Sequence, residues 1–218
     1  PVQRMKFDAA VKRGDIPAAV QAAKLAASLS DSPGDALRLA WAHERSGASA
    51  EARAEYRRIA ERWPKDPAAG EALFANALSD LRTENWAAGE LALDEALRRF
   101  PNLQRRSEAI YWRGIAAIRL GHEEEGVARL KEALSLGISL DQAREANLLV
   151  ADSDARAGRT KDAAARYVEL LSKGASERMS ATHLAAVLRL LAGCGEWEAL
   201  LTGAKALAAR SGDPAFVQ

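Results

Sequence analysis

Residues 70–106 read GEALFANALSDLRTENWAAGELALDEALRRFPNLQRR, and the stretch has the pattern of a helical hairpin. In its first half, apolar residues from Leu73 to Leu81 recur three and four positions apart, as they do on one face of an α-helix. Thr83-Glu84-Asn85 interrupts this pattern. A second apolar face then runs from Trp86 to Leu97, and Pro101 marks its end because proline cannot continue a helix. The segment therefore predicts two helices joined by a tight turn.

The same pattern recurs along the chain at a step of 37 residues. The turn position of the hairpin is occupied by Gly47, Glu84, Gly121, Gly158 and Gly195. A position in the first helix is occupied by Ala40, Ala77, Gly114, Ala151 and Leu188. Charged columns keep the same step, namely Arg45, Arg82, Arg119 and Arg156, and Glu71, Glu108 and Glu145. Self-similarity at a fixed period of this size is the signature of stacked structural repeats.

The repeats predict an all-α, right-handed α-solenoid of about six helix-turn-helix units and roughly twelve helices. No linker rich in Ser, Gly or Pro divides the sequence, so residues 1–218 are interpreted as one continuous domain. The predicted repeats are residues 1–32, 33–69, 70–106, 107–143, 144–180 and 181–217. The sequence begins Pro1-Val2-Gln3 without an initiator methionine, and we expect it to be a fragment of a longer protein.

The composition excludes several classes of partner. The chain has 31 Lys and Arg residues against 30 Asp and Glu, for a net charge of +1. Such a balance gives no long-range field for nucleic acid or an anionic membrane, so neither is expected as a partner. No apolar run approaches the roughly 20 residues that a membrane helix needs, so no insertion of this segment into a membrane is expected. Cys194 is the one cysteine, which rules out a disulfide within the chain.

The repeats resemble the tetratricopeptide repeat (TPR) family over essentially the whole chain. The family's small, aromatic and proline positions are matched in the second repeat by Leu39, Ala40, Gly47, Ala52, Tyr56, Ile59 and Pro64. They are matched in the fourth by Ile110, Gly114, Gly121, Gly126, Leu130 and Ala133, and in the fifth by Ala151, Gly158, Ala163, Tyr167 and Leu170. The period exceeds the family's usual step of about 34, and the last repeat departs from the pattern with Leu188 and Leu200 at small positions.

The resemblance implies that the first helix of each pair lines a concave binding groove. Carried over position by position, it gives the partner-binding candidates Leu37, Trp41, Phe74, Leu78, Arg82, Tyr111, Ile115, Arg119, Asp152 and Arg156. Apolar anchors with an arginine rim suit recognition of a peptide or a helix. Two alternatives stay open: the arginines can be structural, and Phe74, Leu78, Tyr111 and Ile115 can be core residues. Trp86 and Trp197 are expected to pack into a neighbouring helix.

No constellation for catalysis, metal or cofactor binding is visible, so the chain is expected not to be an enzyme. His43, His122 and His183 are far apart in the sequence and have no carboxylate at zinc-ligand spacing. Cys194 has no histidine at helical spacing, which argues against a nucleophile. The family's clamp for chaperone C-termini needs Lys, Asn and Arg at set first-helix positions, which this sequence does not have.

The predicted function is a protein–protein interaction scaffold that docks a peptide or a partner domain. The long period and the endings Trp63-Pro64 and Phe100-Pro101 resemble the TPR scaffolds of the bacterial envelope. That resemblance implies a role in assembling an envelope or secretion complex. It favours a periplasmic or outer-membrane-associated location in a Gram-negative bacterium, with the cytoplasm as the second possibility. The alternative is a structural arm, as in exopolysaccharide-export proteins, whose groove is filled by the protein's own chain.

Overall fold

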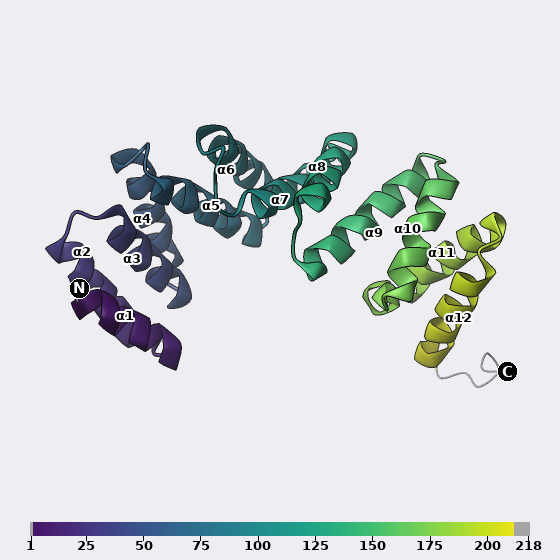
Figure 1. Ribbon diagram of the computed structural model, residues 1–218, viewed down its shortest axis with the longest axis horizontal. Coiled ribbons are helices and arrows are strands. Elements are labelled where there is room, and N and C mark those ends of the chain that lie inside the picture. Colours follow the sequence, from purple (N-terminus) through teal and green to yellow (C-terminus); the bar gives the residue numbers. More distant parts are fainter. Residues whose placement is uncertain (1, 212–218) are drawn as a thin grey trace. The chain divides into compact units, whose positions relative to one another are not determined.

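The computed structural model describes residues 2–211, and in that range it contains twelve α-helices, one 3-10 helix and no strand (Figure 1). The helices are α1 (Val2–Arg13), α2 (Ile16–Leu29), α3 (Pro33–Arg45), α4 (Ser49–Arg62), α5 (Pro67–Arg82), α6 (Trp86–Arg99) and α7 (Arg106–Arg119). They continue with α8 (Glu123–Leu136), α9 (Leu140–Arg156), α10 (Thr160–Ser172), η1 (Ala175–Arg178), α11 (Ala181–Cys194) and α12 (Trp197–Ser211).

The chain divides into two compact units, Pro1–His122 and Glu123–Gln218. The first unit holds α1 to α7 and the second holds α8 to α12, so the division falls inside the predicted repeat 107–143. Within each unit, every helix packs on the next one along the chain, for example α4 on α5 and α9 on α10. The predicted all-α solenoid of helix pairs is confirmed. That residues 1–218 form one continuous domain stays a prediction.

The turn column has the backbone conformation that its glycines predict. Gly47, Gly121, Gly158 and Gly195 have φ between 75° and 88°, in the left-handed region. Glu84 takes the same conformation, with φ 58°, and is the one non-glycine residue with positive φ among the described residues. In each hairpin, the amide that follows this residue donates to a carbonyl five positions earlier. These bonds run from Asp15 to Ala10, Ala48 to His43, Asn85 to Asp80, His122 to Ala117, Arg159 to Asp154 and Glu196 to Leu191.

Several first helices begin at a side-chain cap. Asp66 accepts a hydrogen bond from the Ala68 amide at 2.8 Å, and Pro67 occupies the first turn, where its missing N–H is no loss. The first helices differ in length between repeats: α5 has 16 residues and α9 has 17, against 13 in α3. None of the described helices combines the length and the hydropathy that crossing a membrane requires.

Small residues let the two helices of a pair approach closely. Ala40, Ala77 and Ala151 of the first-helix column are fully buried. At Gly89 in α6, a Cβ atom would lie 2.3 Å from Leu81 Cδ2 in α5, so only glycine fits at that contact. Small residues at these positions therefore let the helix backbones lie close together.

Candidate functional site

An open apolar groove of about 390 Å³ lies between α1 and α3 in the first unit. Two residues predicted to bind a partner, Leu37 and Trp41, line it from α3 and are half-buried. The remaining lining comes from Phe7 and Val11 on α1 and from Gly34 and Arg38 on α3. Apolar walls with a guanidinium at one side suit an aromatic or aliphatic anchor of a protein partner.

The aromatic pair Phe7 and Trp41 forms one wall of the groove. The two rings meet edge to face, with their centroids 5.8 Å apart. Phe7 is buried, whereas Trp41 is only partly covered. The Arg45 guanidinium lies over the Trp41 ring at 5.8 Å from its centroid and keeps a positive charge beside the exposed ring. Both contacts leave part of the Trp41 ring uncovered at the wall of the groove.

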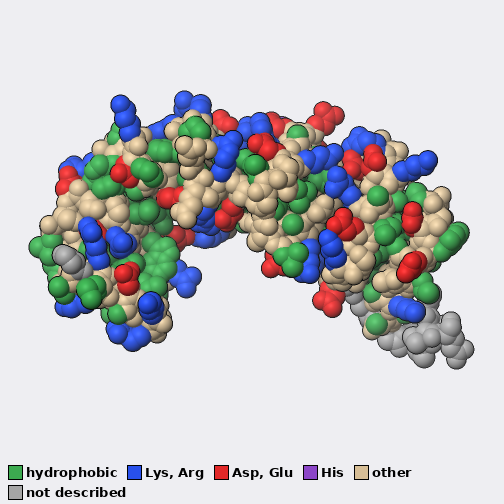
Figure 2. Space-filling model, viewed as in Figure 1, with side chains coloured by type: hydrophobic (Ala, Val, Ile, Leu, Met, Phe, Trp, Pro, Cys, Tyr) green, Lys and Arg blue, Asp and Glu red, His purple; other side chains and the backbone are tan. Residues whose placement is uncertain are grey.

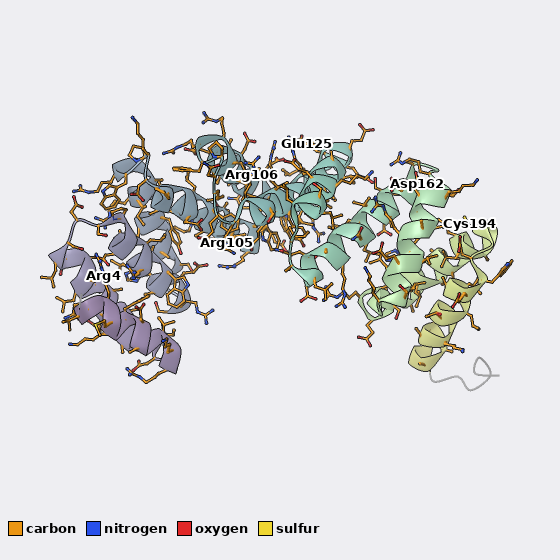
Figure 3. All side chains as sticks on the ribbon, in the orientation of Figure 1. Arg4, Arg105, Arg106, Glu125, Asp162 and Cys194 are labelled. Atoms are coloured by element: carbon orange, nitrogen blue, oxygen red, sulfur yellow. The ribbon has the colours of Figure 1, made fainter. Side chains whose placement is uncertain are left out.

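A buried carboxylate holds α1 against α3 and so fixes the groove. Arg4 donates from Nε to Asp35 Oδ1 and from Nη2 to Asp35 Oδ2, each at 2.8 Å. Arg38 and Ser30 also donate to Asp35, which is 1% exposed. The hydrogen bond from Arg4 holds the pKa of the Asp35 carboxyl below its usual value, and Ser30 and Arg38 act in the same direction. Figure 3 labels Arg4 on α1.

The structure places Phe74, Tyr111 and Ile115 in the core of the first unit, in agreement with the core alternative. Phe74 is fully buried, Tyr111 is 1% exposed and Ile115 is 5% exposed. The guanidinium of Arg105, labelled in Figure 3, lies over the Phe74 ring at 4.4 Å and forms two hydrogen bonds of 2.8 Å with Glu108. Leu78 is half-buried and packs against the same core. None of these four side chains lines the groove between α1 and α3.

Three members of the arginine column, Arg82, Arg119 and Arg156, each contact a helix that comes earlier in the chain. Arg82 pairs with Glu44 of α3, and Arg156 pairs with Glu123 of α8 at 2.7 Å. Arg119 lies over the Trp86 ring at 5.6 Å from its centroid. Each arginine thus has a partner within its own unit, which favours the structural alternative for this column.

In the second unit, Asp152 joins three helices. Its Oδ1 accepts from the Tyr167 hydroxyl at 2.6 Å and lies 2.8 Å from His183 Nε2. Asp152 is on α9, Tyr167 on α10 and His183 on α11. Burial, with a contribution from Asp152, raises the pKa of the Tyr167 phenol. Because its oxygen is already engaged by these neighbours, Asp152 serves the packing of the unit more than a free binding surface.

Sequence reasoning missed the contribution of α1 to the groove and misplaced one tryptophan. With the first step of 33 residues, Phe7 falls in the column of Ala40, where a small residue is expected, and this large side chain was the available signal. Trp86 packs against the core as predicted. The prediction that Trp197 packs into a neighbouring helix is wrong, because 66% of it is exposed.

Comparison with known proteins agrees with the fold described above. Residues 36–66, which cover most of α3 and α4, match the tetratricopeptide repeat family. No curated protein sequence matches the chain.

Solved structures with the same arrangement of helices cover nearly the whole chain. The PilF structure from Pseudomonas aeruginosa aligns with 99% of this chain and 96% of its own, with a TM-score of 0.73 and 15% identity. PilW, described as a widely conserved type IV pilus biogenesis factor, aligns over 95% and 93%, with a TM-score of 0.65 and 18% identity. A tetratricopeptide repeat protein from Parabacteroides merdae aligns over 95% and 78%, with a TM-score of 0.65 and 16% identity. Residues 36–66 thus match the tetratricopeptide repeat family, and the chain around them has the fold of these solved structures.

Proposed function

We propose that the chain is a protein–protein interaction scaffold and that the groove between α1 and α3 holds an apolar anchor of its partner. The observation that carries the proposal is the half-buried Trp41, whose ring contacts Phe7 and Arg45 at the wall of an open groove. Partly exposed tryptophans in such pockets are over-represented among residues that dominate binding energy. Leu37, Val11 and Arg38 complete the lining.

The groove differs from the set of residues that sequence reasoning assigned to it. Leu37 and Trp41 keep the proposed role, and Arg45 joins them as the neighbouring cation. Phe74, Tyr111 and Ile115 are buried outside the groove, so we assign them to the core. Because Arg82, Arg119 and Arg156 already contact a carboxylate or a ring, we assign them to stability and only secondarily to a partner's charge.

We further propose a bacterial envelope or secretion assembly as the setting. The support is the similarity of fold to PilW, which is described as a pilus biogenesis factor, together with the long repeat period. The periplasm or the outer membrane is the compartment that agrees with this setting. The scaffold needs neither a cofactor nor a catalytic group, because docking uses shape, apolar contact and charge alone.

Site-specific crosslinking in the native organism tests the proposal. A photoreactive phenylalanine analogue at position 37 is expected to crosslink to a separate protein, and Trp41→Ala in the same chain is expected to reduce the yield at least about tenfold. Trp197→Ala is the matched control, because it removes another partly exposed tryptophan outside the groove. Crosslinks confined to the protein's own chain would support the structural-arm alternative. Equal yields with Trp41→Ala and with the control would exclude this groove.

A further inference from the structure

In the groove between α1 and α3, Trp41 stands between two arginines of α3. Arg38, three residues before it, lines the groove, and the guanidinium of Arg45, four residues after it, lies over its ring. None of the residues that line the groove is acidic. Figure 2 shows hydrophobic side chains gathered near α3 in the first unit, with Lys and Arg side chains beside them. Charge therefore sets a requirement on the partner in addition to apolar contact.

Arg45 has no carboxylate partner among the described residues. It is exposed, and its contact is with the Trp41 ring. By contrast, Arg82, in the same column of the next repeat, pairs with Glu44. The step between the first two repeats is 33 residues, so the position of Glu44 is held one repeat earlier by Val11, which lines the groove. At Arg45, an apolar wall thus takes the place of the carboxylate that Arg82 meets.

Arg38 keeps hydrogen-bond donors for a carboxylate of a partner. It donates from Nη1 to the Gly34 carbonyl and to Asp35 Oδ1. Its Nε and Nη2 atoms have no acceptor in the described part of the chain. Asp35 is shared with Arg4, which binds both of its oxygens. The two arginines and one carboxylate leave a net positive charge beside the groove, and a guanidinium with free N–H groups suits a carboxylate.

The spacing of the two arginines selects a helix as the occupant. Arg38 and Arg45 are seven residues apart on α3, so they lie on one side of it, about 10 Å apart along its axis. Positions i and i+7 of a second helix laid alongside have the same separation, and its positions i+3 and i+4 face the space between them, beside Trp41. On an extended segment, side chains on one side recur about every 7 Å, which does not match this separation.

The repeat array itself does not place a helix over this groove. α2 packs on both α1 and α3 but contributes no residue to the groove, so the groove opens on the side away from α2. A second helix covers the next first helix on the other side, as α2 covers Leu39 and Ala42 of α3. Both walls of the groove belong to described helices. Its opening is therefore a property of the α1–α3 pair.

We propose that the segment held in the α1–α3 groove is an acidic amphipathic helix of a partner protein, with carboxylates at positions i and i+7 and apolar anchors at i+3 and i+4. The inference rests on the proposed function and names the chemistry of its partner. The anchors pack against Val11, Leu37 and Trp41, and the carboxylates pair with Arg38 and Arg45.

Titration with synthetic helices tests the pattern. The probe is a peptide of about 18 residues with blocked ends, long enough to form a helix. It is built of Ala and Gln, with Glu at i and i+7 and Leu at i+3 and i+4. An isomer has both Glu residues on the opposite face, at i+2 and i+5, and a neutral peptide has Gln in their place. The probe is expected to bind the full chain at least about tenfold more tightly than either. Amide shifts are expected to change in α1 and α3, and binding is expected to weaken with added salt.

Charge reversal at Arg45 tests the assigned ion pair. Arg45→Glu is expected to weaken binding of the probe at least about tenfold and to affect the neutral peptide much less. Arg98→Glu is the matched control, because it reverses an exposed arginine of α6 outside the groove and changes the net charge equally. It is expected to leave both affinities unchanged. Circular dichroism checks that each variant is folded.

The outcomes separate this inference from the proposed function. Equal affinity of the probe and the neutral peptide, with both lost in Trp41→Ala, would overturn the acidic helix and keep the apolar groove. Equal affinity of the probe and its isomer would overturn the assigned spacing. Binding that Trp41→Ala leaves unchanged would contradict the groove itself. Absence of binding by all three peptides would overturn the inference, and the crosslinking experiment would still decide the groove. A dimer of the unliganded chain in sedimentation that Trp41→Ala abolishes would assign the groove to a second copy and overturn the inference.

Discussion

Leu188 on α11 lies so close to Gly203 on α12 that a Cβ atom at position 203 would be 2.6 Å from Leu188 Cδ2. Leu188 stands in the column that holds Ala40, Ala77, Gly114 and Ala151 in the other repeats. The last repeat therefore has the large residue on the first helix and the small one on the second. The close approach of the two helices is kept because the exchange leaves room for one large side chain at the contact.

The contact predicts the effect of filling the space at position 203. Gly203→Ala is expected to lower the free energy of unfolding by about 1–3 kcal/mol, because the added methyl group overlaps Leu188. Urea unfolding followed by circular dichroism measures the change. Gly193→Ala on α11 is the control: a Cβ there meets no atom within 4 Å, and alanine is the better helix former, so a gain of up to about 1 kcal/mol is expected. In the double variant Gly203→Ala, Leu188→Ala, the overlap is removed, and additive losses would contradict this explanation.

The left-handed backbone conformation of Glu84 predicts that a glycine at this position would stabilise the chain. Its φ of 58° is in the left-handed region, where a side chain costs about 1–2 kcal/mol and glycine does not. Glu84→Gly is expected to raise stability by about 0.5–1 kcal/mol, since glycine's extra freedom in the unfolded chain offsets part of the gain. Thermal melting measures it. Gly121→Ala, at the equivalent turn with φ 88°, is expected to lower the melting temperature. A lower melting temperature for Glu84→Gly would contradict the prediction.

Burial of Phe74 predicts a loss of stability rather than a specific loss of binding. Phe74 is fully buried, so Phe74→Ala is expected to cost about 3–5 kcal/mol of unfolding free energy. Removal of a side chain that only met a partner would leave stability nearly unchanged. Leu91→Ala in α6 is the comparison, because 72% of Leu91 is exposed and little change is expected there. A loss of less than about 1 kcal/mol at Phe74 would place its ring outside the core.

The buried hydroxyl of Tyr56 ties α4 to α3. It donates to Glu44 Oε2 at 2.8 Å, and Glu44 also pairs with Arg82. Burial, strengthened by the Glu44 carboxylate, raises the pKa of the phenol. Tyr56→Phe is expected to destabilise the chain by about 1.5–3 kcal/mol, the range for hydrogen bonds to charged groups. Arg82→Ala is expected to cost less than about 1 kcal/mol, because the Arg82 side chain is largely exposed. Denaturant unfolding of both variants measures the two losses of stability. A larger loss for Arg82→Ala than for Tyr56→Phe would contradict the prediction.

The lowered pKa of Asp35 predicts that the stability of the folded chain depends on pH. Its folded-state pKa is lowered, chiefly by Arg4, so the unfolded chain takes up the proton first as the pH falls. The stability from this network is then complete above the unfolded pKa of about 3.9 and is lost as the pH falls through the lower folded pKa. The stability difference between the native chain and Asp35→Asn is expected to stay constant above about pH 5 and to shrink below about pH 4. Exposed Asp8 supplies the control variant Asp8→Asn. A difference that grows on acidification would refute the assignment.

The sequence by itself determined the helices, the turns and the pairing of helices into repeats. These features depend on contacts within a few residues or one repeat, and a period of 37 with left-handed glycines and small residues at set positions expresses them directly. The assignment of Leu37 and Trp41 to a partner-binding groove stays a proposal; in the structure both are half-buried and line the groove between α1 and α3.

Only the tertiary structure decided which first-helix residues are buried and which are exposed. Tyr111 and Trp41 look alike as aromatic first-helix residues, but their exposure depends on neighbours that lie far away in the sequence. Phe7 reaches Trp41 because Arg4 and Asp35 join α1 to α3 across 31 residues. Leu188 is tolerated because Gly203 faces it. Such pairings depend on the distance between helices, and a one-dimensional pattern does not contain that distance.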